Sequence, residues 1–180
     1  LPLLIQSFRL VPGQLRATDK IEIVTYAGNA GQVLEPKSAA EKTSILGALA
    51  QLQAGGSAQG QAGLQLAYRT ASQMAAAQEV TRIILITDGD LNLGLLDSEQ
   101  LKDYIAQERD SGIYLSVLGF GRGNLNDAML QTLAQNGNGQ PAYIDTLSEA
   151  QKVLNDQLSR ALSPSPMMLK FRSNSIRPRF

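Results

Sequence analysis

Four consecutive apolar residues, Ile83 to Ile86, constrain the fold of this chain more than any other stretch. Three of the four are β-branched, and a short run of this composition is typical of a strand that is buried on both faces of a parallel sheet. The run ends at Thr87, Asp88, Gly89 and Asp90. Ligands of open α/β sheets lie just beyond the carboxyl ends of strands, and carboxylates suit Mg²⁺ or Ca²⁺. Asp88 and Asp90 are therefore candidate metal ligands, although a simple turn into the next helix explains them equally well.

The composition excludes several classes of function. The 180 residues include no cysteine and no histidine, which removes disulfides, zinc–sulfur sites and Ser-His catalytic triads. Basic and acidic residues both total 16, so the charge pattern gives no case for binding nucleic acid. No apolar run approaches the ~20 residues of a membrane-spanning helix. These features indicate one globular domain without a membrane span.

Strand-like and helix-like segments alternate along the chain. Pro12 is expected to end a first helix early, and Asn136-Gly137 to end a later one. Ser38 with Glu41, and Thr146 with Glu149, have the spacing of capping boxes at the beginning of helices. Strands are predicted at 19–26, 81–87, 113–118 and 142–145, with a short antiparallel edge strand at Val33-Leu34 that stops at Pro36. Such alternation predicts an α/β fold with a mostly parallel sheet and helices on both faces.

Two enzymatic interpretations have weak support in the sequence. The series Gly119-x-Gly121-x-Gly123 lacks the third glycine of a dinucleotide fingerprint, because Asn124 stands there, and a tight turn explains it better. Asp88-Gly-Asp90 also resembles the phosphoaspartyl hydrolases of the haloacid dehalogenase type, in which the first Asp attacks the phosphate. Asn92 departs from that family's motif, and no later pair of acids completes its Mg²⁺ site.

Three pieces taken together resemble the von Willebrand factor type A (VWA) domain. They are the glycine-rich loop at 55–58 with its following helix, the strand that ends at Asp88, and the segment 118–121. The amino-acid sequence of three segments is similar to that of the bacterial YfbK-type subgroup of the family: 53–68, 87–92 and 137–145. The resemblance covers about residues 1–162. It implies a Rossmann-like three-layer α/β sandwich with a mostly parallel sheet and one short antiparallel edge strand.

The resemblance also implies a metal-ion-dependent adhesion site. In the family, three loops hold one divalent cation (Mg²⁺, Mn²⁺ or Ca²⁺), and an acidic residue of a protein partner fills its open position. Asp88 matches the family's Thr-Asp-Gly motif, with Ser57 and Asp90 as further candidate ligands. Ala58 stands where the family has Thr, and the family's Asp-x-Ser-x-Ser loop would precede Leu1. The implied function is non-enzymatic protein binding through a degenerate metal site, in the bacterial cell envelope; the alternative is a metal-independent scaffold.

Metal binding by this chain is expected to be weak or absent. Mg²⁺ requires about six oxygen ligands in near-octahedral geometry, and one or two carboxylates alone hold it weakly. Isothermal calorimetry is the measurement. A submillimolar affinity for Mg²⁺ or Mn²⁺ that the Asp88→Ala substitution abolishes would contradict this expectation.

The resemblance further implies that the first, central strand of the family's sheet is missing between the strands at 19–26 and 81–87. Those two strands must then pair directly or leave open edges, which are an aggregation hazard, so a destabilised or oligomeric protein is expected. Residues 1–162 would form a partial VWA domain. Residues 163–180 are expected to form an irregular basic tail. The codons for the family's next strand, read one nucleotide out of frame, can give the sequence at 168–178, which suggests a frameshift near Ser163.

Overall fold

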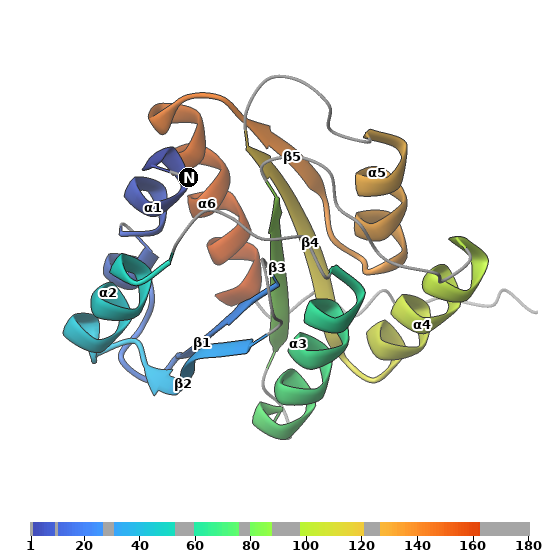
Figure 1. The fold of residues 1–180 in the computed structure, drawn as a ribbon, viewed down its shortest axis with the longest axis horizontal. Coiled ribbons are helices and arrows are strands. Elements are labelled where there is room, and N and C mark those ends of the chain that lie inside the picture. The colour runs from blue at the N-terminus through green and yellow to red at the C-terminus, as the bar shows by residue number, and fades with distance from the viewer. Residues whose placement is uncertain are drawn as a thin grey trace, which may run out of the picture.

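The computed structural model describes residues 2–9, 11–26, 31–52, 60–75, 80–87, 98–120 and 127–162. Helices and strands alternate over most of this length, as the sequence predicts (Figure 1). In chain order the elements are α1 (Pro2–Phe8), the 3-10 turn η1 (Val11–Gly13), β1 (Lys20–Thr25), β2 (Gly31–Ser38), α2 (Lys42–Ala50), α3 (Gly60–Met74), β3 (Thr81–Thr87), α4 (Ser98–Asp110), β4 (Ile113–Phe120), α5 (Asp127–Asn136), β5 (Pro141–Ile144) and α6 (Leu147–Leu162).

The described strands form two separate sheets. β3, β4 and β5 lie in that order in a parallel sheet, whereas β1 and β2 form an antiparallel pair. The register of β3 on β4 runs without a shift from Thr81 opposite Ile113 to Thr87 opposite Gly119. Within the described residues, β1 and β3 are not hydrogen-bonded to each other as strands. The parallel sheet confirms the predicted α/β class, and direct pairing of β1 with β3 is not seen among the described strands.

β3 is less buried than the sequence predicts. In this strand only Leu85 and Thr87 are buried, and the other five residues are partly exposed. In β4, by contrast, every residue except Tyr114 is buried. The reason is the number of neighbours: β4 has a strand on each side, whereas β3 pairs only with β4 among the described strands. The prediction of a fully buried strand at Ile83 to Ile86 was therefore wrong, because β-branched composition does not reveal whether a neighbouring strand is present.

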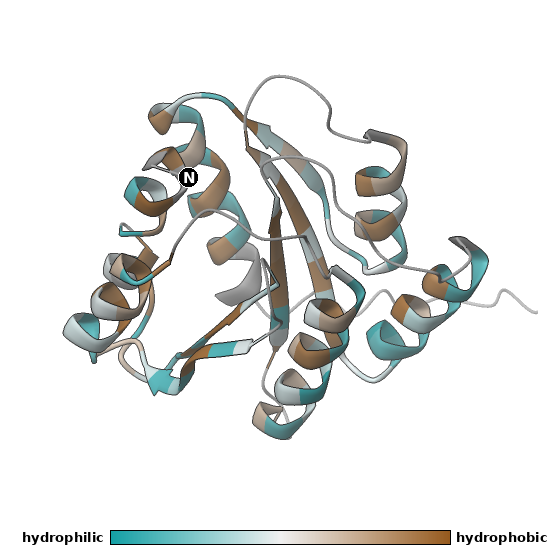
Figure 2. Ribbon diagram, viewed as in Figure 1, coloured by the Kyte–Doolittle hydropathy of each residue, from teal (hydrophilic) through white to brown (hydrophobic). Residues whose placement is uncertain are grey.

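Helices cover both faces of the parallel sheet, which confirms the predicted sandwich (Figure 1). One core cluster packs α3, α4 and α5 against β3 and β4, and a second packs α1 and α6 against all three parallel strands. Figure 2 shows hydrophobic residues along these strands and hydrophilic residues on the outer faces of the helices. A third cluster lies between α2 and the β1–β2 pair, and it shares only Phe8 and Ile21 with the second cluster.

β2 extends beyond the predicted Val33-Leu34 and runs through Pro36 to Ser38. Ile23 lies opposite Leu34, but Ile21 lies opposite Lys37, so the register shifts next to Pro36. A shift of this kind leaves one residue outside the ladder, which accommodates a proline that has no N–H to donate. The prediction that Pro36 stops the strand was therefore wrong.

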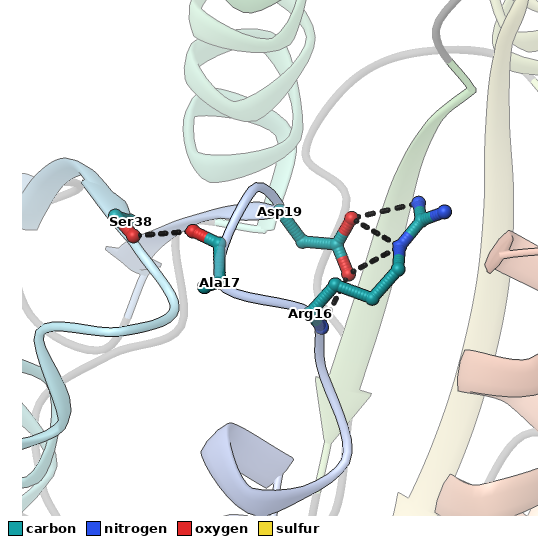
Figure 3. A network of polar contacts seen from close by, with 4 residues as sticks. All are labelled: Arg16, Ala17, Asp19 and Ser38. Carbon is teal, nitrogen blue, oxygen red and sulfur yellow. Dashed lines mark hydrogen bonds and ion pairs between the residues drawn. The ribbon is translucent and has the colours of Figure 1, made fainter.

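Ser38 does not cap a helix as its spacing with Glu41 predicted. Its hydroxyl donates to the carbonyl of Ala17 at 2.6 Å, and α2 begins at Lys42 without a side-chain cap (Figure 3). In the same turn Asp19 accepts hydrogen bonds from Arg16, which raise the pKa of this exposed guanidinium. These contacts close the turn that leads into β1. At the second predicted capping box the hydroxyl of Thr146 accepts from the N–H of Glu149 at 3.2 Å, whereas the carboxylate of Glu149 accepts from the N–H of Asp145, one residue before the predicted cap.

Candidate functional site

The carboxyl ends of β3, β4 and β5 lie at one edge of the parallel sheet. Thr87, with 5% of its surface exposed, is the last residue of β3 and lies opposite Gly119 of β4. Sheets of this class bind their ligands at this edge, because loops leave the strands there. Segment 88–97 follows β3 at this edge, and segment 121–126 follows β4. The described geometry therefore marks the carboxyl edge as the candidate functional site.

Tyr26 shows that α3 begins at the same edge. Its hydroxyl donates to the backbone carbonyl of Ile86 at 2.5 Å, so the carboxyl ends of β1 and β3 lie together. Gly63, in the first turn of α3, lies so close to Tyr26 that an added Cβ would overlap the Cβ of the tyrosine. Segment 53–59, which leads into α3, therefore joins the described fold at the edge from which segment 88–97 departs.

The three predicted ligands lie outside the described residues. Asp88 and Asp90 follow the last described residue of β3, and Ser57 precedes the first described residue of α3. The glycines at 121 and 123 are also outside, whereas Gly119 and Phe120 are the last residues of β4. That Asp88, Ser57 and Asp90 share one cation stays a prediction, and so does the turn interpretation of the glycine series.

The resemblance implies a divalent cation at the carboxyl edge. Within the described ranges, no three acidic side chains lie close enough together to hold a metal ion. The exposed Asp145 follows β5 at the carboxyl edge, and its backbone N–H donates to the carboxylate of Glu149 at the beginning of α6. The predicted ligands add two carboxylates and one hydroxyl, which is fewer than the roughly six oxygens that Mg²⁺ takes. The remaining ligands would have to come from segments outside the described residues, so weak metal binding stays a prediction.

A buried polar network lies away from this edge. Arg82, near the amino end of β3, donates to the hydroxyl of Ser116 at 3.1 Å and stacks over the ring of Tyr114. Ser116, which is fully buried, donates in turn to the side-chain carbonyl of Gln157 at 2.7 Å. These two hydrogen bonds join β3 and β4 to α6.

A pair of tyrosines lies between α3 and α4. The rings of Tyr68 and Tyr104 meet edge to face, with 5.4 Å between their centroids. Burial raises the pKa of both hydroxyls, with a smaller contribution from Glu108, so both stay protonated near neutral pH. The hydroxyl of Tyr68 has no hydrogen-bond partner within the described part of the chain. Neither hydroxyl is therefore a base near neutrality.

The fold defines a class: a Rossmann-like α/β domain with a parallel sheet between two layers of helices and a separate antiparallel strand pair. The von Willebrand factor type A domain profile matches residues 2–157, and the chain belongs to that family. Members of this family often mediate protein interactions and are generally non-catalytic. None of the described helices is long and apolar enough to span a bilayer.

The chain is 44% identical over 162 residues to the uncharacterized protein YfbK of Escherichia coli (strain K12). That similarity covers 90% of this chain but only 28% of YfbK. A von Willebrand factor type A structure from Catenulispora acidiphila matches with a TM-score of 0.73 and 16% identity, over 89% of this chain and 38% of that one. Proximal thread matrix protein 1 from the mussel byssus, with a zinc-occupied MIDAS motif, matches with a TM-score of 0.64 and 19% identity, over 89% and 40%. At these identities the two structures show a shared fold.

Proposed function

We propose that this chain is a non-enzymatic protein-binding domain whose contact surface is the carboxyl edge of the sheet. Asp88, Ser57 and Asp90 would form a degenerate metal-ion-dependent adhesion site there. The observation that supports this most is the contact of Tyr26 with both the end of β3 and the first turn of α3. Because of that contact, the two segments that carry the three residues attach at one edge.

The chemistry of the partner depends on whether a cation is bound. A divalent cation with an open position attracts a carboxylate, so the adhesion-site interpretation implies an acidic residue on the partner. Without a cation, two aspartates repel such a residue, and binding would then use the metal-independent alternative on the same face. The mussel structure supports the first interpretation, because its MIDAS motif is occupied by zinc. The cell envelope is the compartment that we propose, on the family resemblance.

Replacing Asp88 with alanine is expected to reduce partner binding at least tenfold. The test immobilises the chain, exposes it to a bacterial extract and quantifies the captured proteins with the wild type and the Asp88→Ala variant. Asp110→Ala is the matched control, because it removes the same charge from an exposed residue at the end of α4, next to the amino end of β4. Equal capture by both variants, or no saturable capture by the wild type, would contradict the proposed function.

The same assay separates the alternatives. Capture that requires millimolar Mg²⁺ and disappears with EDTA supports the adhesion-site interpretation, whereas capture that EDTA leaves unchanged supports the metal-independent scaffold. The phosphoaspartyl hydrolase alternative predicts turnover of p-nitrophenyl phosphate that is lost on Asp88→Asn. We expect no turnover, because the family is generally non-catalytic.

A further inference from the structure

We propose that Asn138 is a conformation-gated deamidation site. In the folded protein, the turn after α5 withholds the backbone nitrogen that would attack the Asn138 side chain. Local opening of that turn releases the nitrogen and starts the reaction. The modification is spontaneous and independent of the proposed function, and the residues that control it are described ones in α5, in the turn after it and in β4.

Two Asn-Gly pairs follow each other at the end of α5: Asn136 with Gly137, and Asn138 with Gly139. The side-chain amide of an asparagine is open to attack by the backbone nitrogen of the next residue. A glycine in that position favours the attack, because it has no Cβ to hinder the approach and its backbone is free to rotate. The same residues that end the helix are therefore chemically labile when the chain is unfolded.

The reaction needs only water as a co-reactant. The nitrogen of Gly139 attacks Cγ of Asn138, the bond from Cγ to the side-chain nitrogen breaks, and that nitrogen leaves as ammonia with the proton of the glycine N–H. Water then opens the resulting five-membered succinimide at one of its two carbonyls. One opening gives an ordinary aspartate. The other gives an isoaspartate, in which the main chain runs through Cγ and is one carbon longer.

The folded turn keeps the attacking nitrogen occupied. The N–H of Gly139 donates to the carbonyl of Ala134 at 2.8 Å, and Asn138 has the φ of 53° that this kind of helix end requires. Gly139 also lies directly against the backbone of Leu115 in β4. Attack on Cγ requires the peptide unit to turn toward the side chain, so these contacts must break first. Because Asn138 is exposed, these contacts limit the reaction and the access of water does not.

Asn136 is held more firmly and is an internal comparison within the same segment. Its side-chain Nδ2 donates to the carbonyl of Thr132 at 2.8 Å, one turn back in α5. The nitrogen that would attack it, that of Gly137, donates to the carbonyl of Leu133 at 3.0 Å. Reaction at Asn136 therefore requires the last turn of the helix to unwind as well. We expect Asn138 to react first in the folded protein.

The isoaspartate product would not fit the folded turn. Gly139 lies so close to β4 that an added Cβ would overlap the carbonyl of Leu115. A main chain lengthened by one carbon just before Gly139 would move it against that backbone and away from the carbonyl of Ala134. An ordinary aspartate keeps the main-chain length and adds only a negative charge near the C-terminal end of α5, which is mildly unfavourable. Isoaspartate at position 138 is therefore expected to hold the turn open.

The first experiment compares two rates at one nitrogen. Hydrogen exchange at the Gly139 amide, followed by NMR, reports how often the turn opens. Peptide mass spectrometry with fragmentation follows deamidation at Asn138 and Asn136 separately in the same chain. Folding is expected to slow deamidation of Asn138 at least tenfold relative to the chain unfolded in urea, and to slow that of Asn136 further. Exchange and deamidation should be slowed by the same factor, within tenfold, because one opening permits both.

A series in dilute urea, below the unfolding transition, makes this comparison sharper. If the turn is the gate, the two rates rise in parallel as urea favours the open form. A folded protein that deamidates Asn138 within tenfold of the unfolded rate overturns the gate. So does a deamidation rate that does not follow exchange at Gly139, or faster reaction at Asn136 than at Asn138.

The second experiment tests whether the product holds the turn open. Aged protein is separated by chromatography, and the isoaspartate form is compared with the Asn138→Asp variant. This variant is the matched control, because it carries the same charge without the longer main chain. Exchange at the Gly139 amide is expected to be at least tenfold faster in the isoaspartate form than in Asn138→Asp. A smaller difference would show that the turn accommodates the extra carbon, and this part of the proposal would fall.

Discussion

Replacing Gly139 with alanine is expected to lower the free energy of unfolding by about 4 kcal/mol or more, or to prevent folding. A Cβ at Gly139 would overlap the backbone carbonyl of Leu115 in β4. That backbone cannot move aside cheaply, because β4 is paired with β3 on one side and with β5 on the other. Since the clash involves backbone atoms and not the end of a flexible side chain, the cost approaches the 5–15 kcal/mol stability of a typical domain.

The local turn explains why a glycine is required there. The N–H of Gly139 donates to the carbonyl of Ala134 at 2.8 Å, and the N–H of Asn138 donates to that of Gln135. With Asn138 at a φ of 53°, this is the Schellman arrangement that ends many helices. The prediction that α5 ends near Asn136-Gly137 is confirmed, but the left-handed residue is Asn138.

Urea unfolding monitored by circular dichroism measures this effect, and Gly47→Ala is the matched control. Gly47 lies inside α2, and a Cβ there would meet no atom within 4 Å. The same substitution is therefore expected to stabilise the protein by about 0.5–1 kcal/mol, because alanine favours the helix. If the free energy of unfolding of Gly139→Ala lies within 1 kcal/mol of the wild-type value, the backbone of β4 moves aside for the added Cβ, and the prediction is wrong.

The sequence predicted those parts of the fold that depend on local pattern. The predicted strand 81–87 coincides with β3, and the alternation of strands and helices fixed the α/β class. Burial of β3 and the extension of β2 through Pro36 could not be predicted, because both depend on which strand lies alongside. No pattern in the sequence reveals that β1 and β2 form a separate sheet, since pairing across a sheet is not local.

For the candidate site, too, the sequence predicts what depends on a local motif and misses what depends on distant contacts. Asp88, Ser57 and Asp90 follow from a motif, and they remain predictions because they lie outside the described residues. Sequence reasoning missed Tyr26, because its partner, the carbonyl of Ile86, is 60 residues away and any residue type can provide a carbonyl. One signal was available: Gly63 interrupts an otherwise regular helix, and such a glycine indicates a close neighbour.

The second large effect concerns the stability of β1 and β2. Their amides are expected to exchange at least 100-fold faster than those of β4 in the native protein, a difference of about 2.8 kcal/mol. An isolated two-stranded sheet is marginally stable, and this one is completed mainly by α2 and the small cluster around Leu34, Ile45 and Leu49. Among the described residues, Phe8 and Ile21 contact both the second and the third cluster and so link this sheet to a larger core. The hydroxyl of Tyr26 adds a hydrogen bond to Ile86 of β3.

β4 provides the opposite extreme within the same molecule. Leu115, Val117 and Leu118 are fully buried between two layers of helices, and their strand is paired on both edges. Opening β4 therefore requires opening both larger cores, whereas opening β1 and β2 requires little more than separating the third cluster. Native-state hydrogen exchange resolved by NMR compares these amides in one sample, so the β4 amides serve as the internal control.

Open edges should also affect association. Among the described strands β3 pairs only with β4, and a partly exposed apolar strand without proline can pair with another chain if its second edge is open. Sedimentation velocity over a hundredfold range of concentration is expected to show self-association, with the transition shifting to higher concentration in dilute urea. A monomer throughout that range, with equal protection of β1 and β4, would mean that side-chain contacts alone join the two sheets into one cooperative unit. The expectation of a destabilised or oligomeric protein would then be wrong.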